Sequence, residues 1–197
     1  MKMARVLGIA ESFSLNQPLS FLSGVVMRRD FAVDGVSITT ITVGGSDATG
    51  MIVKLYSEMR RNDISAIMIN GCVLSMYNIV EAGTVSSQTG LPVVCIASSE
   101  GRDLEGGMTS HGNFSKVEQY RSLGRQARAR LKTGYDIWVR AFGLELNDAV
   151  NLLNEYTVAG RVPEPVRVAR LISSACLRAS AKGACGKRVN SADQKGI

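Results

Sequence analysis

The feature that most constrains the fold is an alternation of short apolar runs with helix-period segments in the middle of the chain. Residues 65–70 and 91–97 are apolar runs typical of buried strands. Residues 78–89 between them, and residues 47–59 before them, carry apolar side chains at helical spacing. Consecutive strands joined through helices pair in parallel by right-handed crossovers. This region therefore predicts parallel βαβ units.

The chain before this region predicts antiparallel strands. Residues 4–10 are typical of a largely buried strand, and residues 24–31 and 36–43 are two further β-rich runs. Val33-Asp34-Gly35 separates the last two runs, and Asp-Gly is a strong hairpin signal. The expected fold is an α/β, ribonuclease H-like mixed sheet, with antiparallel hairpin strands followed by parallel βαβ units and helices on both faces.

The second half predicts mostly helices. A polar, glycine-containing stretch at 98–112 is expected to be an exposed loop, and residues 135–141 a strand. Pro165 suits the first turn of a helix, where Glu164 would lie at the positive end of the helix dipole. Helices are expected at 116–132, 147–156 and 165–179, the first of them basic. Residues 1–179 are expected to form a single domain, and residues 180–197 a flexible basic tail.

Composition limits the class of protein. The chain has 197 residues, enough for one domain with a sizeable core, and no apolar run long enough to span a membrane. No signal peptide is recognisable at the N-terminus, so we expect a cytoplasmic protein without a membrane partner. The four cysteines have no Cys-x-x-Cys spacing and His111 is the only histidine, so buried free thiols are favoured over a zinc site. A single histidine also disfavours a serine or cysteine hydrolase.

Positive charge is concentrated in the second half. The net charge is +6, with seven Lys/Arg against eight Asp/Glu in residues 1–100 and sixteen against nine in residues 101–197. Such asymmetry indicates either a basic surface that faces a polyanion or an ordinary solvated helical face. The glycine pairs at 44–45 and 106–107 lack the spacing of phosphate-binding or dinucleotide-binding loops.

Polar residues follow the ends of three predicted strands. Glu11 follows the first strand, Asp47 comes after the third, and Asn70 ends the first parallel strand. Ligands of open α/β sheets bind beyond the carboxyl ends of strands, where oxygen ligands would hold Mg²⁺ or Mn²⁺. Each residue also has an ordinary structural interpretation: a solvated carboxylate for Glu11, a helix N-cap for Asp47 and a turn residue for Asn70.

Several stretches together resemble the endonuclease dU family, formerly a domain of unknown function related to endonuclease V. The resemblance covers roughly residues 4–175 and is carried by the order and spacing of Arg5-Val6-Leu7-Gly8-Ile9, Asp34-Gly35-Val36, Val43-Gly44-Gly45-Ser46-Asp47-Ala48-Thr49, Tyr77-Asn78-Ile79-Val80-Glu81, Leu91-Pro92-Val93-Val94 and Gly160-Arg161-Val162-Pro163-Glu164-Pro165-Val166-Arg167-Val168-Ala169. It implies a ribonuclease H-like fold and metal-dependent cutting of DNA that contains deaminated bases such as deoxyuridine.

The chain departs from the family pattern at acidic positions. Relatives have an aspartate where this chain has Ala10, and endonuclease V has Asp-Gly where this chain has Asn70-Gly71. Relatives often read Val-Asp-Gly where Val43-Gly44-Gly45 stands, and Glu81 replaces an aspartate. Asp47 keeps its carboxylate. With fewer anionic ligands, Mg²⁺ or Mn²⁺ would be held weakly or lost.

The resemblance favours a metal-dependent endodeoxyribonuclease. Its catalytic residues would be Glu11, Asp47 and Asn70, with Glu11 and Asp47 as metal ligands. The residues expected to contact DNA, or RNA as the alternative, are Tyr77, Arg121, Arg125, Arg128, Lys132 and Arg167. A second hypothesis is a non-catalytic nucleic-acid- or partner-binding relative with an eroded metal site, and a third is a small-molecule binder on the same scaffold. The lesion, the cleavage position and the oligomeric state, a homodimer included, stay open.

Overall fold

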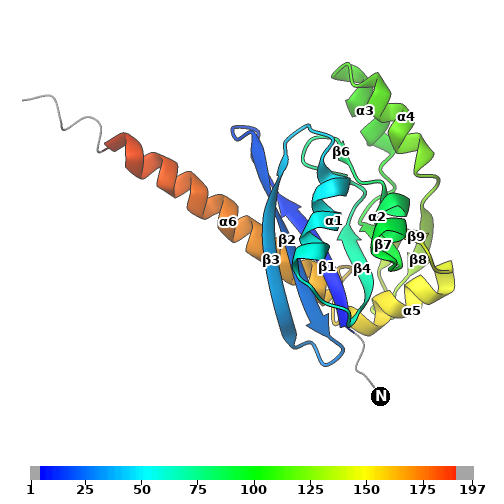
Figure 1. The fold of residues 1–197 in the computed structure, drawn as a ribbon. Helices are drawn as coiled ribbons and strands as arrows, with labels where there is room; N and C mark the ends of the chain where they lie inside the picture. The colour runs from blue at the N-terminus through cyan, green and yellow to red at the C-terminus, as the bar shows by residue number, and fades with distance from the viewer. Residues whose placement is uncertain (1–4, 190–197) are drawn as a thin grey trace, which may run out of the picture.

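A mixed seven-stranded sheet forms the centre of the protein in the computed structural model, which describes residues 5–189. Its strand order is β3-β2-β1-β4-β7-β9-β8 (Figure 1). The strands are β1 (Arg5–Ser12), β2 (Leu19–Arg28), β3 (Val33–Thr42), β4 (Ile64–Asn70), β7 (Val93–Ala97), β8 (Ala127–Arg130) and β9 (Asp136–Phe142). β1, β2 and β3 pair antiparallel, whereas β4 pairs in parallel with β1 and β7. The predicted mixed sheet is confirmed.

Helices cover both faces of the sheet. Helices α1 (Ala48–Glu58) and α2 (Ala82–Thr89) bury apolar side chains on one face, together with Leu7 and Ile9 of β1. Helices α5 (Leu146–Tyr156) and α6 (Glu164–Val189) pack on the other face, together with Val6 and Ala10. Helices α3 (Arg102–Ser110) and α4 (Phe114–Ser122) lie next to each other, with a small hairpin of β5 (Val73–Leu74) and β6 (Asn78–Ile79) close to α4.

Gly8 sets the distance between α6 and the sheet. A Cβ atom added to Gly8 would lie 2.3 Å from the carbonyl carbon of Pro165 and 2.6 Å from the nitrogen of Val166. Only glycine therefore allows the first turn of α6 to approach β1 this closely. The helix begins at Glu164, as the Pro163-Glu164-Pro165 sequence predicts.

The first hairpin turns earlier than predicted. The turn lies between β2 and β3, where Phe31 has φ +65° and its N–H donates to the carbonyl of Arg28 at 3.0 Å. Asp34 and Gly35 lie inside β3. The pairing shifts register between Val26 and Met27, which leaves Asp34 as the extra residue of a β-bulge. The Asp-Gly signal thus marks a bulge and not the turn.

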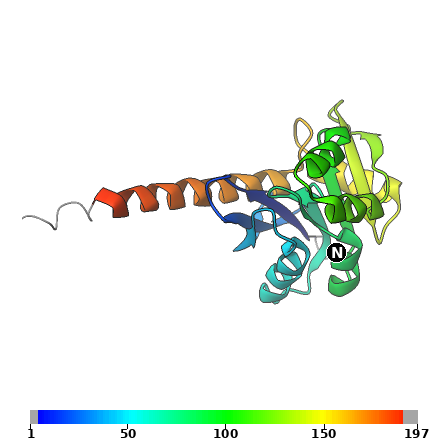
Figure 2. The same cartoon turned by 90° about the horizontal axis from the view of Figure 1, so that it is seen from above.

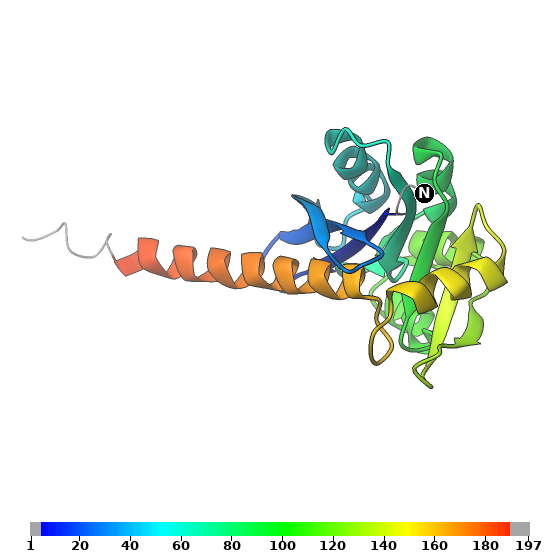
Figure 3. The same ribbon diagram turned by 90° about the horizontal axis from the view of Figure 1, so that it is seen from below.

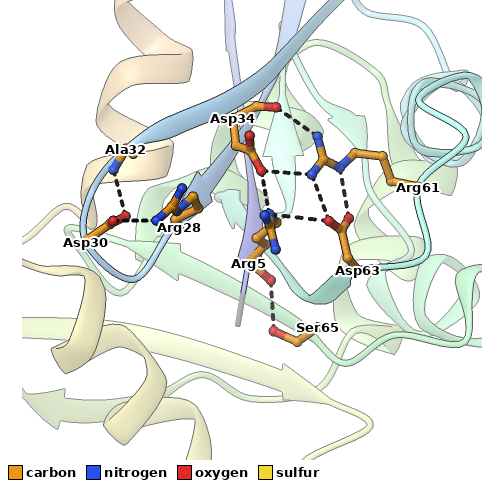
Figure 4. A network of polar contacts seen from close by, with 8 residues as sticks. All are labelled: Arg5, Arg28, Asp30, Ala32, Asp34, Arg61, Asp63 and Ser65. Atoms are coloured by element: carbon orange, nitrogen blue, oxygen red, sulfur yellow. Dashed lines mark hydrogen bonds and ion pairs between the residues drawn. The ribbon is translucent and has the colours of Figure 1, made fainter. Parts of the chain in front are cut away.

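The bulge places Asp34 in a network of ion pairs near the start of β1. Its carboxylate accepts hydrogen bonds from Arg5 and, at 2.9 Å, from Arg61 (Figure 4). Arg61 also binds both oxygens of Asp63, at 2.9 and 2.8 Å. The two guanidinium groups hold the pKa of Asp34 and of Asp63 below their ordinary values. The network joins β1, β3 and the segment that precedes β4.

Two predictions for residues 98–132 were wrong. The stretch 98–112 is not only a loop, because it contains α3. The expected helix at 116–132 ends at Ser122, and residues 127–130 form β8. Gly124, with φ +75°, stops the helix in the left-handed conformation that glycine adopts readily. Arg128 and Arg130 then alternate with half-buried alanines in a strand that pairs with β9.

The last helix is longer than predicted. We expected it to end at Ala179, whereas α6 continues to Val189. Its later turns extend past the edge of the sheet (Figures 2 and 3). The expected flexible tail is therefore helical as far as Val189, and its remainder, 190–197, lies outside the described residues. Among the helices that the structure describes, none is long and apolar enough to cross a membrane.

Candidate functional site

The carboxyl ends of β1, β4 and β7 meet at one edge of the sheet, because these strands run in parallel. This is where α/β proteins place ligands. Successive side chains of a strand point to opposite faces, so Ala10 and Glu11 are on different sides of the sheet. The alternation puts Asn70 on the face of Met68, which is also the face of Ala10 and α6.

Glu11 lies on the α1 and α2 face and is held by serine hydroxyls. Its carboxylate accepts from Ser20 Oγ at 2.7 Å, from Ser75 Oγ at 3.0 Å and from the Ser75 N–H at 3.3 Å. Ser20 and Ser75 are both buried. These bonds tie the end of β1 to the hairpin loop between β5 and β6.

The carboxylate of Asp47, just before α1, is also held by hydrogen bonds. It occupies the N-cap position but makes no side-chain cap hydrogen bond. Its carboxylate instead accepts from Thr42 Oγ1 at 2.8 Å, from the Thr42 N–H at 3.0 Å and from Asn78 Nδ2 at 2.6 Å. Partial burial favours the neutral acid, but these hydrogen bonds outweigh it and lower the pKa of Asp47 below its ordinary value.

Asn78 is the polar residue at this site that sequence reasoning missed. It is fully buried and its Oδ1 accepts from the Ala48 N–H at 3.0 Å, which caps α1 in place of Asp47. Its Nδ2 donates to the carbonyl of Thr42 at 2.9 Å as well as to Asp47. Sequence analysis assigned Asn78 to a helix, and nothing in the local pattern shows that its amide would join β3, α1 and β6.

The opposite face of the strand ends carries no carboxylate at the matching positions. Ala10 is fully buried, and Ser173 of α6 donates to its carbonyl at 2.9 Å. Asn70 lines a small cavity of about 80 Å³ together with Ser98, Arg161 and Arg170. The structure thus brings Glu11 and Asp47 to one hairpin, at Ser75 and Asn78, and Asn70 to the other face of the sheet.

The side chains at these strand ends form a poor binding site for a divalent cation. Mg²⁺ and Mn²⁺ sites are built from converging carboxylate oxygens. Ala10 offers no side-chain ligand, Asn70 is neutral, and the oxygens of Glu11 and Asp47 already accept three or more hydrogen bonds each. Among residues 5–189, no three His, Cys, Asp or Glu side chains come close enough to hold a metal ion together.

Lys116 of α4 reaches the loop that contains Gly44 and Gly45. Its ammonium group donates to the carbonyls of Gly44 and Gly45, both at 2.6 Å. Partial burial lowers the pKa of Lys116, against the attraction of Asp47. These two hydrogen bonds therefore hold the loop of Gly44 and Gly45 against α4.

Two larger cavities continue along the strand ends from the small one. The nearer has a volume of about 250 Å³ and shares Asn70, Ala97 and Ser98 with it. The farther, of about 410 Å³, shares Gly101, Tyr120 and Arg140 with the nearer one. We call this row of three cavities the strand-end groove. The arginines that line it are Arg121, Arg125, Arg140, Arg161 and Arg170.

Arg140 is a buried cation in the middle of this groove. It is 7% exposed, lies over the ring of Tyr120 at 5.0 Å and donates from Nε to the carbonyl of Gly124 at 3.0 Å. Cys72 and Cys95 are buried free thiols, as predicted. The hydrogen bond from Cys95 lowers the pKa of Cys72, and burial raises the pKa of Cys95. Cys176 is half-buried and free, and the side chain of Cys185 lies outside the described part.

The cationic residues expected to contact nucleic acid fall into two groups. Arg121, Arg128 and Arg167 each form an ion pair, with Glu105, Asp136 and Glu164 respectively. Arg125 and Lys132 are exposed, and their side chains make no ion pair or hydrogen bond with the described residues. Tyr77 has φ +68° and packs between Gly107 and the ring of His111.

Comparisons with known proteins agree with this architecture. A sequence profile of the family named Endonuclease dU matches residues 2–177. A UPF0215 protein of Pyrobaculum calidifontis is 37% identical over 171 residues, which are 85% of this chain and 94% of that protein. The structure of a protein of unknown function from Archaeoglobus fulgidus superposes with a TM-score of 0.74 at 28% identity, covering 88% of this chain and 98% of that one.

Endonuclease V shares the fold at lower identity. The Ciona intestinalis enzyme, in complex with a DNA that contains an inosine followed by a ribo-adenosine, superposes with a TM-score of 0.63 at 16% identity. The match covers 90% of this chain and 87% of that one. This likeness identifies the ribonuclease H-like fold that the sequence predicts. Because the family profile spans nearly the whole length, the chain belongs to the endonuclease dU family.

Proposed function

We propose that this protein binds nucleic acid along the strand-end groove and does not cut it by the metal-dependent route of a nuclease. The observation that carries the proposal is the distribution of charge about the strand ends. Ala10 and Asn70 leave one face without a carboxylate, while Glu11 and Asp47 lie on the other face in hydrogen bonds to the β5–β6 hairpin and to β3.

Nucleic-acid binding is supported by the cations that line the groove. Arg125 and Arg170 are exposed and make no ion pair with the residues that the structure describes, so their charge is available to phosphate groups. The second half of the chain supplies these residues and carries the excess of positive charge. The fold is also shared with a protein seen in complex with DNA. DNA is therefore the proposed partner.

The proposal is tested with labelled duplexes that contain uracil or hypoxanthine, and with an undamaged duplex. Each is incubated with the purified protein in EDTA, Mg²⁺ or Mn²⁺ and assayed for both binding and strand breaks. We expect binding in all three buffers, a steep fall in affinity with added salt, and no breaks. A flat salt response, or no binding, would refute the proposal.

Metal-dependent cutting is the second candidate function, and membership of the endonuclease dU family favours it. In that case Glu11 and Asp47 would serve as metal ligands with Asn70 beside them, and the hydrogen bonds to Ser75 and Asn78 would have to rearrange. The same assay distinguishes the two functions. Strand breaks that require Mn²⁺ and disappear in Glu11→Gln and Asp47→Asn would establish the nuclease in place of the binding protein.

A further inference from the structure

The small cavity at the end of β4 is basic where a metal site would be acidic. Asn70, Ser98, Arg161 and Arg170 supply its polar lining, and Ile96, Ala97, Ile137 and Val162 complete its wall. No carboxylate belongs to this lining. The cavity lies at the carboxyl ends of β4 and β7, on the face that carries Ala10 and Asn70. Two guanidinium groups thus line this cavity with no carboxylate among its lining residues.

We propose that Arg161 and Arg170 bind one phosphodiester group of a nucleic acid in this cavity, with the Asn70 amide and the Ser98 hydroxyl as additional donors. This inference deepens the proposed function and rests on it. In chemical terms, arginine cations take over the charge neutralisation that metal ions would supply.

The size of the cavity fits this ligand. A volume of about 80 Å³ corresponds to roughly two or three water molecules in the liquid. That space is sufficient for one tetrahedral phosphate group. Guanidinium groups present paired N–H donors that match phosphate oxygens, and hydrogen bonds between ionised partners are among the strong ones.

The nearby acidic groups do not neutralise the two arginines. Glu164, at the start of the same helix, forms an ion pair with Arg167 at 2.5 Å. Asp136 pairs with Arg128 at 2.6 Å and with Arg130 at 3.6 Å, and its pKa is lowered first by Arg128 and only weakly by Arg161. Arg161 stacks over the ring of Tyr135 at 5.5 Å, which orients its guanidinium group without cancelling its charge.

The test compares Arg161→Ala and Arg170→Ala with the matched control Arg178→Ala. Arg178 is an exposed arginine two turns farther along α6, outside the lining of the cavity. Each cavity variant is expected to weaken binding of a short duplex about tenfold and to reduce the salt slope by roughly one. The control should change affinity less than about threefold. All three side chains are exposed, so folding should be unaffected, which circular dichroism verifies.

A second variant separates arginine binding from metal binding. Asn70→Asp puts a carboxylate into the cavity that both arginines line, so in EDTA it should lower duplex affinity at least as much as Arg170→Ala. Addition of Mn²⁺ should not restore the affinity. If Mn²⁺ instead raised the affinity of Asn70→Asp above that of the wild type, the cavity would be a metal site and the inference would be wrong.

Two sources of phosphate are distinguished by titration. Inorganic phosphate and a dinucleotide with a single phosphodiester are added separately to the wild type and to Arg170→Ala, and the arginine Nε–H signals are followed by NMR. We expect saturable shifts with the dinucleotide in the wild type and none in the variant. Saturation by inorganic phosphate alone would assign the cavity to the free anion and overturn the inference.

Failure of the inference and failure of the proposed function give different results. If the wild type binds duplex and the cavity variants bind as tightly as Arg178→Ala, the cavity is not the phosphate site but the proposed function stands. If the wild type binds no duplex, the proposed function fails, and absence of any dinucleotide shift then removes the inference as well.

Discussion

At the scale of single residues, Gly8 is a position where the packing of α6 on the sheet leaves no room for a side chain. Its hydrogen atoms face the first turn of α6, and a Cβ there would overlap the backbone of Pro165 and not a flexible side chain. The backbone of two packed elements cannot relax as a side chain can, so the helix would have to move away from β1.

We predict that Gly8→Ala lowers the free energy of unfolding by about 2–3 kcal/mol, through overpacking. Gly50→Ala is the matched control, since Gly50 lies in α1 with no atom within 4 Å of its added Cβ. That variant should be about 0.5–1 kcal/mol more stable, because alanine is the better helix former. Urea unfolding at neutral pH measures both. Equal stability of the two variants would contradict the close approach of α6.

Asn78 is the second residue on which the site depends, because its amide bonds Asp47, Thr42 and Ala48 at once. We predict that Asn78→Asp destabilises the protein by about 2–4 kcal/mol at pH 7, since it places two carboxylates in contact and removes a donor. Repulsion between the two carboxylates raises their pKa. The loss of stability that Asn78→Asp shows beyond Asn78→Ala is therefore present above the raised pKa, and it becomes smaller as the pH falls through that pKa. Asn78→Ala should show no such recovery. If the stability difference between Asn78→Asp and Asn78→Ala were the same at pH 7 and pH 4, the contact between the two carboxylates would be contradicted.

At the scale of elements, the ion-pair network ties the bulge of β3 to β1 and to the start of β4. Arg5 and Arg61 lower the pKa of Asp34 and Asp63 in the folded protein, relative to about 3.9 in the unfolded chain. A lowered pKa contributes stability above the unfolded value, and that stability disappears as the pH falls through the folded value.

We therefore predict that Asp34→Asn reduces the urea midpoint at pH 7 and that the difference from the wild type narrows below about pH 4. Asp30→Asn is the control, because Asp30 forms an exposed pair with Arg28 in the turn before β3 and should matter little (Figure 4). If the effect of Asp34→Asn stayed constant down to pH 2, the carboxylate would not be the source of the stability.

The elements also show which parts of a fold a sequence reveals. β1, β4 and β7 are continuous apolar runs, and a parallel strand buried on both faces leaves that pattern. β8 is four residues long, and its Ala-Arg-Ala-Arg sequence contains good helix formers. Its pairing with β9 decides its conformation, and the sequence of β8 by itself gives no sign of that pairing. The true turn at Asp30 was likewise hidden by the stronger Asp-Gly signal four residues later.

At the scale of the whole molecule, the strand ends could be predicted but their faces could not. Sequence analysis put Glu11, Asp47 and Asn70 near one edge of the sheet, because strand ends gather there. Whether they converge depends on the register of β1. A shift of one residue in this register would exchange the faces of the sheet on which Ala10 and Glu11 lie. The basic cavity of Arg161 and Arg170 was missed for a related reason: its residues come from β4, β7, β9, the loop between α5 and α6, and α6 itself.

A titration of the wild-type protein with Mn²⁺, followed by electron paramagnetic resonance at neutral pH, tests the central claim most directly. With Ala10 and Asn70 at the strand ends, and Glu11 and Asp47 held in hydrogen bonds, we predict no stoichiometric Mn²⁺ binding and an unchanged free-ion signal. The opposite result would be one Mn²⁺ bound per chain in the wild type, and lost in both Glu11→Gln and Asp47→Asn.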